Sequence, residues 1–206
     1  MEQDNTLLSL FCFLEKRIKL QNFRPFFLAI DGKCGSGKTT LAQRIAASFP
    51  AEIVHMDDFF LPPQLRTPER LAEPGGNIHY ERFILEVLEP CSHALGPYLC
   101  SYRPFECKNM EYSSKPRLVH NRPLLIIEGS YSMRPDFQPY YHASIYLDCS
   151  YSLQAYRLKN RNPERYPDFV ARWIPMENLY FNTFRIRQRC TFRLSSEELI
   201  DTSRLI

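Results

Sequence analysis

The sequence contains no C-x-x-C pair, no internal repeat and no low-complexity tract, and glycine is scarce. Its seven cysteines are scattered and odd in number, so they indicate neither a disulfide framework nor a zinc site. The five histidines also lack the spacing of metal ligands. We therefore set aside the disulfide-rich secreted class and expect a protein of the reducing cytoplasm.

A membrane-spanning run is also missing from the sequence. The apolar stretch at residues 7–14 follows acidic residues and leads directly into the charged residues 15–17, which fits neither a signal peptide nor a membrane span. The 26 basic and 23 acidic residues nearly balance, which argues against a dedicated nucleic-acid binder and fits a protein that handles anionic ligands. At 206 residues and 44% hydrophobic content, the chain suits a single domain, residues 1–206, with a substantial core.

Three of the seven glycines fall within one octapeptide, Gly32 to Thr39, which reads GKCGSGKT. It fits the phosphate-binding pattern G-x-x-x-x-G-K-[ST] without a mismatch. The apolar residues 26–30 before it predict a buried parallel strand, and apolar residues at helical spacing follow it. In this setting glycines let backbone N–H groups reach phosphate oxygens, and the N-terminus of the helix attracts the anion. The predicted nucleotide-binding residues are Gly32, Gly35, Ser36, Gly37, Lys38, Thr39 and Thr40.

Carboxylates follow two further predicted strands. Asp57 and Asp58 come directly after the strand at residues 53–56, and Glu128 comes directly after the apolar strand at residues 124–127. Open α/β sheets bind ligands at the carboxyl ends of their strands, so these side chains are candidates for one phosphate site. A carboxylate directly after four apolar strand residues is costly unless it is paired or bound to a metal ion, which favours a functional Glu128. For Asp58, a helix cap or a solvated turn is an equal alternative.

The rest of the pattern predicts a helix near each end of the chain and a long excursion in the middle. The predicted helices lie at residues 7–18, at 80–88, after 148 up to about 159, and at 175–189, and the predicted strands lie at 98–102, 110–112, 117–120, 144–147 and 199–200. Residues 61–76, rich in proline and glycine, predict an ordered, exposed loop. Residues 61–122 exceed what a helix crossover needs, and we interpret them as an inserted acceptor-binding subdomain.

With these residues in place, the sequence resembles the uridine kinase and phosphoribulokinase superfamily of P-loop small-molecule kinases. Four features carry the resemblance: the P-loop with its helix, the DDFF run at residues 57–60, the IIEGSYS run at residues 126–132, and the lid-like segment from Arg157 to Glu177. The resemblance implies a three-layer α/β P-loop fold with a mainly parallel sheet. It also implies an N-terminal helix within residues 1–24, an inserted hairpin subdomain and a lid at residues 157–172.

The same resemblance implies roles for individual residues. Lys38 would bind the outer phosphates, Thr39 and Glu128 would hold Mg²⁺, and Asp57 would be the base for the acceptor hydroxyl. Arg161 lies in the region whose arginines meet the phosphates or the acceptor, and we assign it a catalytic role. Because Arg157 and Arg161 are one helical turn apart, a solvated charged face is an equal alternative for both. The residues implied to contact the acceptor are Asp57, His79, Tyr80, Tyr102, Arg103 and Arg157.

The sequence departs from the family at two acceptor positions. The aspartate that often holds the ribose has no counterpart at residues 77–81, so that His79 or Glu81 would replace it. Cys107 lies close to the place of a histidine that uridine kinases use near the base. Both departures bear on the identity of the acceptor.

These observations predict an Mg²⁺-dependent kinase that transfers the γ-phosphate of ATP, or of GTP, to a hydroxyl group of a small molecule. A nucleoside is the leading acceptor, and pantothenate or a sugar phosphate is the alternative. A nucleotide-binding regulatory module without an acceptor is a further hypothesis, against which the position of Asp57 argues. A nucleic-acid-dependent ATPase ranks last, because the basic residues lack interleaved aromatics. The sequence predicts no nucleic-acid or membrane partner and leaves a homo-oligomer open.

Overall fold

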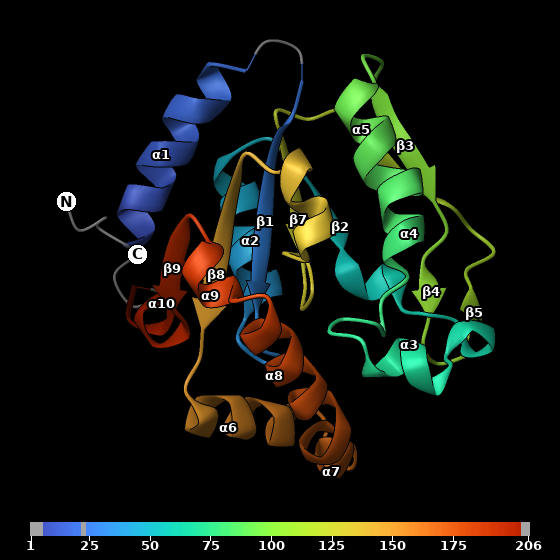
Figure 1. Cartoon of the computed structure of the whole chain (residues 1–206). Coiled ribbons are helices and arrows are strands. Elements are labelled where there is room, and N and C mark those ends of the chain that lie inside the picture. The colour runs from blue at the N-terminus through green and yellow to red at the C-terminus, as the bar shows by residue number, and fades with distance from the viewer. Residues whose placement is uncertain (1–5, 22–23, 203–206) are drawn as a thin grey trace.

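A five-stranded parallel sheet forms the centre of the computed structural model, which describes residues 6–21 and 24–202 (Figure 1). The strand order is β2-β7-β1-β8-β9, and each neighbouring pair is parallel. The strands are β1 (Phe26–Gly32), β2 (Ala51–His55), β7 (Leu124–Glu128), β8 (Ala143–Asp148) and β9 (Phe192–Ser195). Every residue of β1 and β7 is buried, because these strands have neighbours on both edges and helices on both faces.

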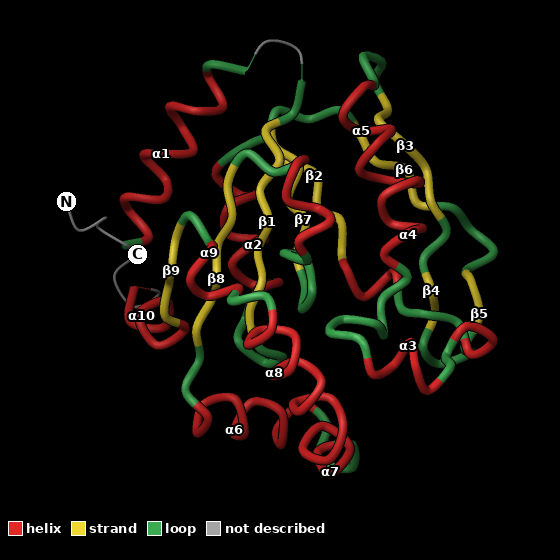
Figure 2. Tube along the Cα trace, viewed as in Figure 1, coloured by secondary structure: helices red, strands yellow, loops and turns green. Residues whose placement is uncertain are grey.

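Helices cover both faces of this sheet (Figure 2). On one face, α1 (Leu7–Lys19) and α2 (Lys38–Ser48) pack their apolar sides on β1 and β7. On the other face, residues of β1, β2 and β7 pack against the inserted segment and against α8 (Ile174–Thr183). The result is the predicted three-layer α/β arrangement.

The segment between β2 and β7 lies to one side of the sheet and contains helices and two small hairpins (Figure 1). Its helices are α3 (Pro68–Ala72), α4 (Tyr80–Phe83) and α5 (Glu89–His93), with π-helical turns between α4 and α5. Its antiparallel pairs are β3 (Tyr98–Tyr102) with β6 (Arg117–His120) and β4 (Phe105–Glu106) with β5 (Glu111–Tyr112). The predicted short strands are therefore present. The predicted exposed loop at residues 61–76 holds two short helical turns, and its Leu61 is buried.

The segment after β8 is mainly helical. Its helices are α6 (Tyr151–Arg161), α7 (Tyr166–Asp168), α8, α9 (Ile186–Arg189) and α10 (Ser196–Thr202), and π-helical turns at residues 169–173 connect α7 to α8. The single helix predicted at residues 175–189 is wrong, because Arg185 adopts a left-handed backbone conformation with φ 51° and separates α8 from α9.

The strand predicted at residues 199–200 is also wrong, because α10 covers that position and the edge strand is β9. The two glutamates in the first turn of α10 favour a helix there, since they face the positive end of the helix dipole. β9 buries alternate residues, a pattern that four residues define only weakly. Among the described residues, no helix is both long enough and apolar enough to cross a membrane.

Candidate active site

The phosphate-binding octapeptide forms the turn between β1 and α2, at the carboxyl end of the sheet. Gly32 has φ 150°, and a Cβ atom there would lie 2.3 Å from the carbonyl oxygen of Leu147 in the neighbouring strand. Gly37 has φ 97° and precedes the first residue of α2. The close approach of β8 and the left-handed turn into the helix therefore both require glycine.

The N-terminus of α2 is open to an anion. Its capping residue, Gly37, provides no side-chain hydrogen bond, and the first turn of the helix contains no acidic residue. The Ser36 hydroxyl is buried without a hydrogen-bond partner among the described residues. Unpaired N–H groups and the helix dipole favour the binding of phosphate at such a terminus.

Lys38 is buried and folds back over the loop. Its Nζ atom donates to the carbonyl oxygens of Gly32 (2.8 Å) and Lys33 (2.9 Å) and to the Ser130 hydroxyl (3.2 Å). It forms no ion pair with any carboxylate in the part of the chain that the structure describes. Its charge is therefore held at the loop and is available to a phosphate group.

Thr39 and Glu128 meet directly beside Lys38. The Thr39 hydroxyl donates to Glu128 Oε1 at 3.0 Å, and the same oxygen lies 2.5 Å from His55 Nδ1. The hydrogen bond to Glu128 raises the pKa of His55, and burial opposes this effect. Among the described residues, no cluster of three or more histidine, cysteine or carboxylate side chains could hold a metal ion alone. A hydroxyl and a buried carboxylate are instead the hard oxygen donors that suit Mg²⁺ carried by nucleotide phosphates.

Asp57 and Asp58 lie in the turn after β2 and have different surroundings. Two groups hold the Asp58 carboxylate, namely the Tyr102 hydroxyl at 2.7 Å and the Arg117 guanidinium at 3.2 Å, so it ties β2 to the inserted hairpin. Asp57 has no hydrogen-bond or ion-pair partner among the described residues and faces the cavity. Asp57 is exposed to the open space of the cavity. Partial loss of water next to the surrounding protein raises the pKa of its carboxyl group, whereas the charge of Lys38 lowers it.

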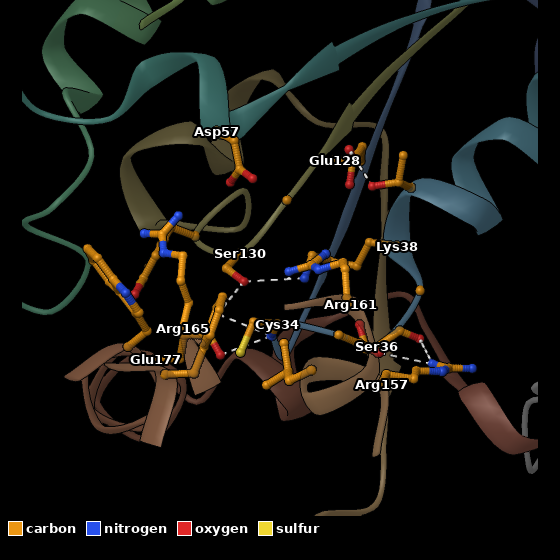
Figure 3. A pocket seen from close by; sticks show the side chains of 18 of the residues that line it. Cys34, Ser36, Lys38, Asp57, Glu128, Ser130, Arg157, Arg161, Arg165 and Glu177 are labelled. Carbon is orange, nitrogen blue, oxygen red and sulfur yellow. Dashed lines mark hydrogen bonds between the residues drawn. The ribbon is translucent and has the colours of Figure 1, made fainter. Parts of the chain in front are cut away.

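One cavity of about 1570 Å³ joins these groups. Figure 3 shows Asp57, Lys38, Glu128 and Arg161 facing the same open space. Arg157, from the segment predicted to be a lid, donates to the carbonyl oxygens of Gly35 (3.0 Å) and Ser36 (2.8 Å), so it braces the loop predicted to bind phosphate. The predicted nucleotide-binding residues that line the cavity are Gly35, Ser36, Gly37, Lys38, Thr39 and Thr40, whereas Gly32 lies beneath it.

The four residues of the inserted segment that the resemblance implies for the acceptor do not line this cavity. His79 lies 3.3 Å from the Tyr112 hydroxyl, and Tyr80 is stacked between two arginine side chains. Tyr102 is buried and donates to Asp58, while Arg103 donates to the carbonyl oxygens of two residues in the second hairpin. Their geometry is that of side chains that support the inserted segment, so their contact with an acceptor stays a prediction.

Solved structures with the same arrangement are known, although no family model matches the sequence and no curated protein matches it. A possible uridine kinase from Bacillus stearothermophilus has a TM-score of 0.67 and 20% identity over 91% of this chain and 98% of that chain. A candidate fructose transport system kinase from a Silicibacter species has a TM-score of 0.64 and 23% identity over 92% and 98%. The chain has the fold of uridine kinase-like P-loop kinases. The structure of YFH7 from Saccharomyces cerevisiae, a candidate P-loop kinase with a circular permutation, is also similar. It has a TM-score of 0.60 and 12% identity, over 95% of this chain and 99% of that chain.

Three side chains at the site were not predicted from the sequence to be part of it. Glu177 is buried and accepts hydrogen bonds from the Cys34 N–H (3.0 and 3.1 Å) and from the Ser130 hydroxyl (2.6 Å), so it ties α8 to the phosphate loop. Asp31 is buried beneath the loop, where it accepts from three donors; burial raises its pKa to about 6. Asn77, the third, lines the cavity. No periodicity marks these residues, although Glu177 ends a run that carried the family resemblance.

Proposed function

We propose that the protein is an Mg²⁺-dependent kinase that transfers the γ-phosphate of ATP to a hydroxyl group of a small molecule. The observation that carries the proposal is the position of Asp57, a carboxylate without a partner among the described residues that faces the same cavity as Lys38 and the phosphate loop. A nucleotide switch needs no such base, whereas phosphoryl transfer to a hydroxyl does.

The residues present fit each part of the reaction. The loop N–H groups, the N-terminus of α2 and Lys38 hold the phosphates, and Thr39 with Glu128 would hold Mg²⁺. When bound, the ion would neutralise charge on the transferred group. The acceptor oxygen attacks the γ-phosphorus, the bond between that phosphorus and the β–γ bridging oxygen breaks, and ADP leaves. Asp57 receives the proton of the acceptor hydroxyl.

A nucleoside was the leading acceptor from the sequence, and it stays one candidate. Of the residues implied to contact a nucleoside, Asp57 and Arg157 line the cavity, and the other four do not. The cavity is large enough for a nucleotide and a second small molecule together. The proposal is therefore a small-molecule kinase, with the acceptor class taken up below.

The test is acceptor-dependent release of ADP. The purified protein is incubated with Mg-ATP and separately with uridine, cytidine, pantothenate and ribose 5-phosphate. We expect at least one compound to raise ADP release well above the rate without acceptor. ADP release that no acceptor changes, together with intact Mg-ATP binding, would support the regulatory module instead.

A further inference from the structure

Three arginines that line the cavity lie close to one another and to Cys107. Arg165 and Arg172 come from the lid, and Arg66 comes from the segment that follows β2. None of the three forms an ion pair within residues 6–21 and 24–202. Figure 3 shows Arg165 extending from the lid toward the side of the cavity where Asp57 lies.

These arginines are close enough to act on one another and on their neighbours. The Arg66 guanidinium lies 5.9 Å from the ring of Phe105 in β4. Burial lowers the pKa of Arg66, and the charge of Arg172 lowers it further. Burial and the charge of Asp57 raise the pKa of the Cys107 thiol, whereas the charges of Arg66 and Arg165 lower it. Like charges therefore gather at one end of the cavity.

The neighbouring carboxylates form no ion pair with these three arginines in the described part of the chain. Asp58 is held by Tyr102 and Arg117. Asp57 and Asp168 line the same cavity, and neither forms an ion pair with any described residue. Arg66 Nε donates to the Leu61 carbonyl oxygen at 2.7 Å, and the Arg172 guanidinium lies 4.8 Å from the Trp173 ring centroid, so both side chains are held in place without a carboxylate partner. Guanidinium groups that converge in a concave site without such a partner attract an anion and match the paired oxygens of a carboxylate or a phosphate.

An unpartnered amide in the same cavity points to the rest of the ligand. The Asn77 side chain is 5% exposed, and neither its nitrogen nor its oxygen has a hydrogen-bond partner among the described residues. Its backbone is fixed, because its carbonyl oxygen accepts from the Leu61 N–H at 2.9 Å. The Tyr131 hydroxyl lies nearby but does not meet hydrogen-bond geometry with it. A buried amide without partners is costly, and a ligand hydroxyl can both donate to it and accept from it.

We propose that the acceptor is a small hydroxylated anion, whose carboxylate or phosphate group is bound by Arg66, Arg165 and Arg172 and one of whose hydroxyl groups is bound by Asn77. This inference rests on the proposed kinase function and specifies its acceptor. Arg157 is separate from this set, since it donates to the phosphate loop itself. A neutral nucleoside would leave the three guanidinium groups without an anionic partner.

The test compares related acceptors of which one carries an anionic group and the other has a neutral hydroxyl in its place. The pairs are glycerate with glycerol, pantothenate with pantothenol, and ribose 5-phosphate with ribose, each measured with Mg-ATP by ADP release. We expect kcat/KM to be about tenfold or more higher for the anionic member of at least one pair, because a charge-assisted contact is lost in the neutral member. The carboxylate and phosphate pairs show which anion the site takes. Equal or faster turnover of the neutral members, or of uridine, would overturn the inference and leave the kinase proposal intact.

Variants locate the effect in the proposed site. Arg66→Gln and Arg172→Gln should each raise KM for the anionic acceptor about tenfold and leave KM for Mg-ATP unchanged. Arg122→Gln, at an exposed position outside the cavity, is the matched control and should change neither. Asn77→Asp keeps the side-chain size but adds a negative charge, so it should also raise KM for the anion. A rise in KM for Mg-ATP alone would place the arginines at the nucleotide and contradict the inference.

A second readout does not depend on turnover. Thermal unfolding is followed with a non-hydrolysable ATP analogue and each compound of the three pairs. We expect an anionic member to raise Tm in the wild-type protein and in Arg122→Gln, but not in a protein carrying both Arg66→Gln and Arg172→Gln. Stabilisation without phosphorylation would contradict the kinase proposal and support the anion site, whereas no stabilisation by any anion would count against the site.

Discussion

Replacing Glu128 by glutamine separates the metal site from the phosphate loop. In the wild type, the Thr39 hydroxyl donates to Glu128 Oε1 at 3.0 Å. Glutamine keeps an oxygen that can accept this hydrogen bond, so the contact between β7 and α2 should persist. The change removes one buried negative charge from the place where Mg²⁺ would bind. Loss of a partner that orients or balances a bound metal costs roughly 10–100-fold in affinity, and we expect a rise of this size in the Mg²⁺ concentration for half-maximal activity.

The assay is a Mg²⁺ titration of acceptor-dependent ADP release at saturating ATP. Activity of Glu128→Gln should recover in part at high Mg²⁺, whereas Glu89→Gln, at an exposed glutamate of α5, should follow the wild-type curve. An NMR titration of His55 gives an independent check. Its pKa should fall in Glu128→Gln, because the hydrogen bond to Glu128 is the main cause that raises it. A Mg²⁺ curve identical to that of the wild type would refute the assigned metal role.

The remaining predictions concern charges at the same cavity. Lys38→Ala should reduce phosphoryl transfer about a hundredfold or more, and it should lower the free energy of unfolding by roughly 1–3 kcal/mol, measured with urea, because two loop carbonyl groups lose a buried donor. Asp57→Asn should slow transfer by on the order of a hundredfold with Mg-ATP affinity retained. In the wild type, kcat/KM should fall as the pH drops through the raised pKa of Asp57, because the base becomes protonated. The same pH profile of kcat/KM in Asp57→Asn would show that Asp57 is not the base. Arg161→Ala should lower kcat more than it weakens Mg-ATP binding; a change in thermal stability alone would indicate a solvated side chain.

The central sheet and the phosphate loop could be predicted because the sequence encodes them locally. The strands β1 and β7 are buried on both faces, and such strands appear as unbroken apolar runs. The octapeptide fixes its own backbone, since Gly32 and Gly37 occupy conformations that other residues rarely adopt. Both features depend on neighbouring residues in the sequence, and the structure agrees with both predictions.

The wall of the acceptor end could not be predicted in the same way. Asn77 and His79 are two residues apart, yet Asn77 lines the cavity while the His79 side chain lies against Tyr112. Which of them faces the ligand depends on how the inserted helices and hairpins pack, and no short-range pattern encodes this packing. The same holds for Glu177, which meets Cys34 across 143 positions of sequence.

The Lys38 side chain shows a further limit of local reasoning. A loop lysine is expected to face solvent, but this one is 8% exposed and bonds to loop carbonyl groups. Burial follows from the way the loop closes over the end of β1, next to Ser130 from the turn after β7. Its removal therefore affects stability as well as catalysis.

Direct detection of the phosphorylated acceptor tests the kinase proposal most directly. The protein is incubated with ATP labelled in its γ-phosphate, Mg²⁺ and the anionic and neutral acceptor pairs, and the label is followed by mass spectrometry. We predict that the wild-type protein transfers the label to a hydroxyl group of an anionic acceptor and that Asp57→Asn, while still binding Mg-ATP, transfers on the order of a hundredfold less. Label found solely in inorganic phosphate, at the same rate in both proteins and whatever acceptor is added, would contradict the proposal.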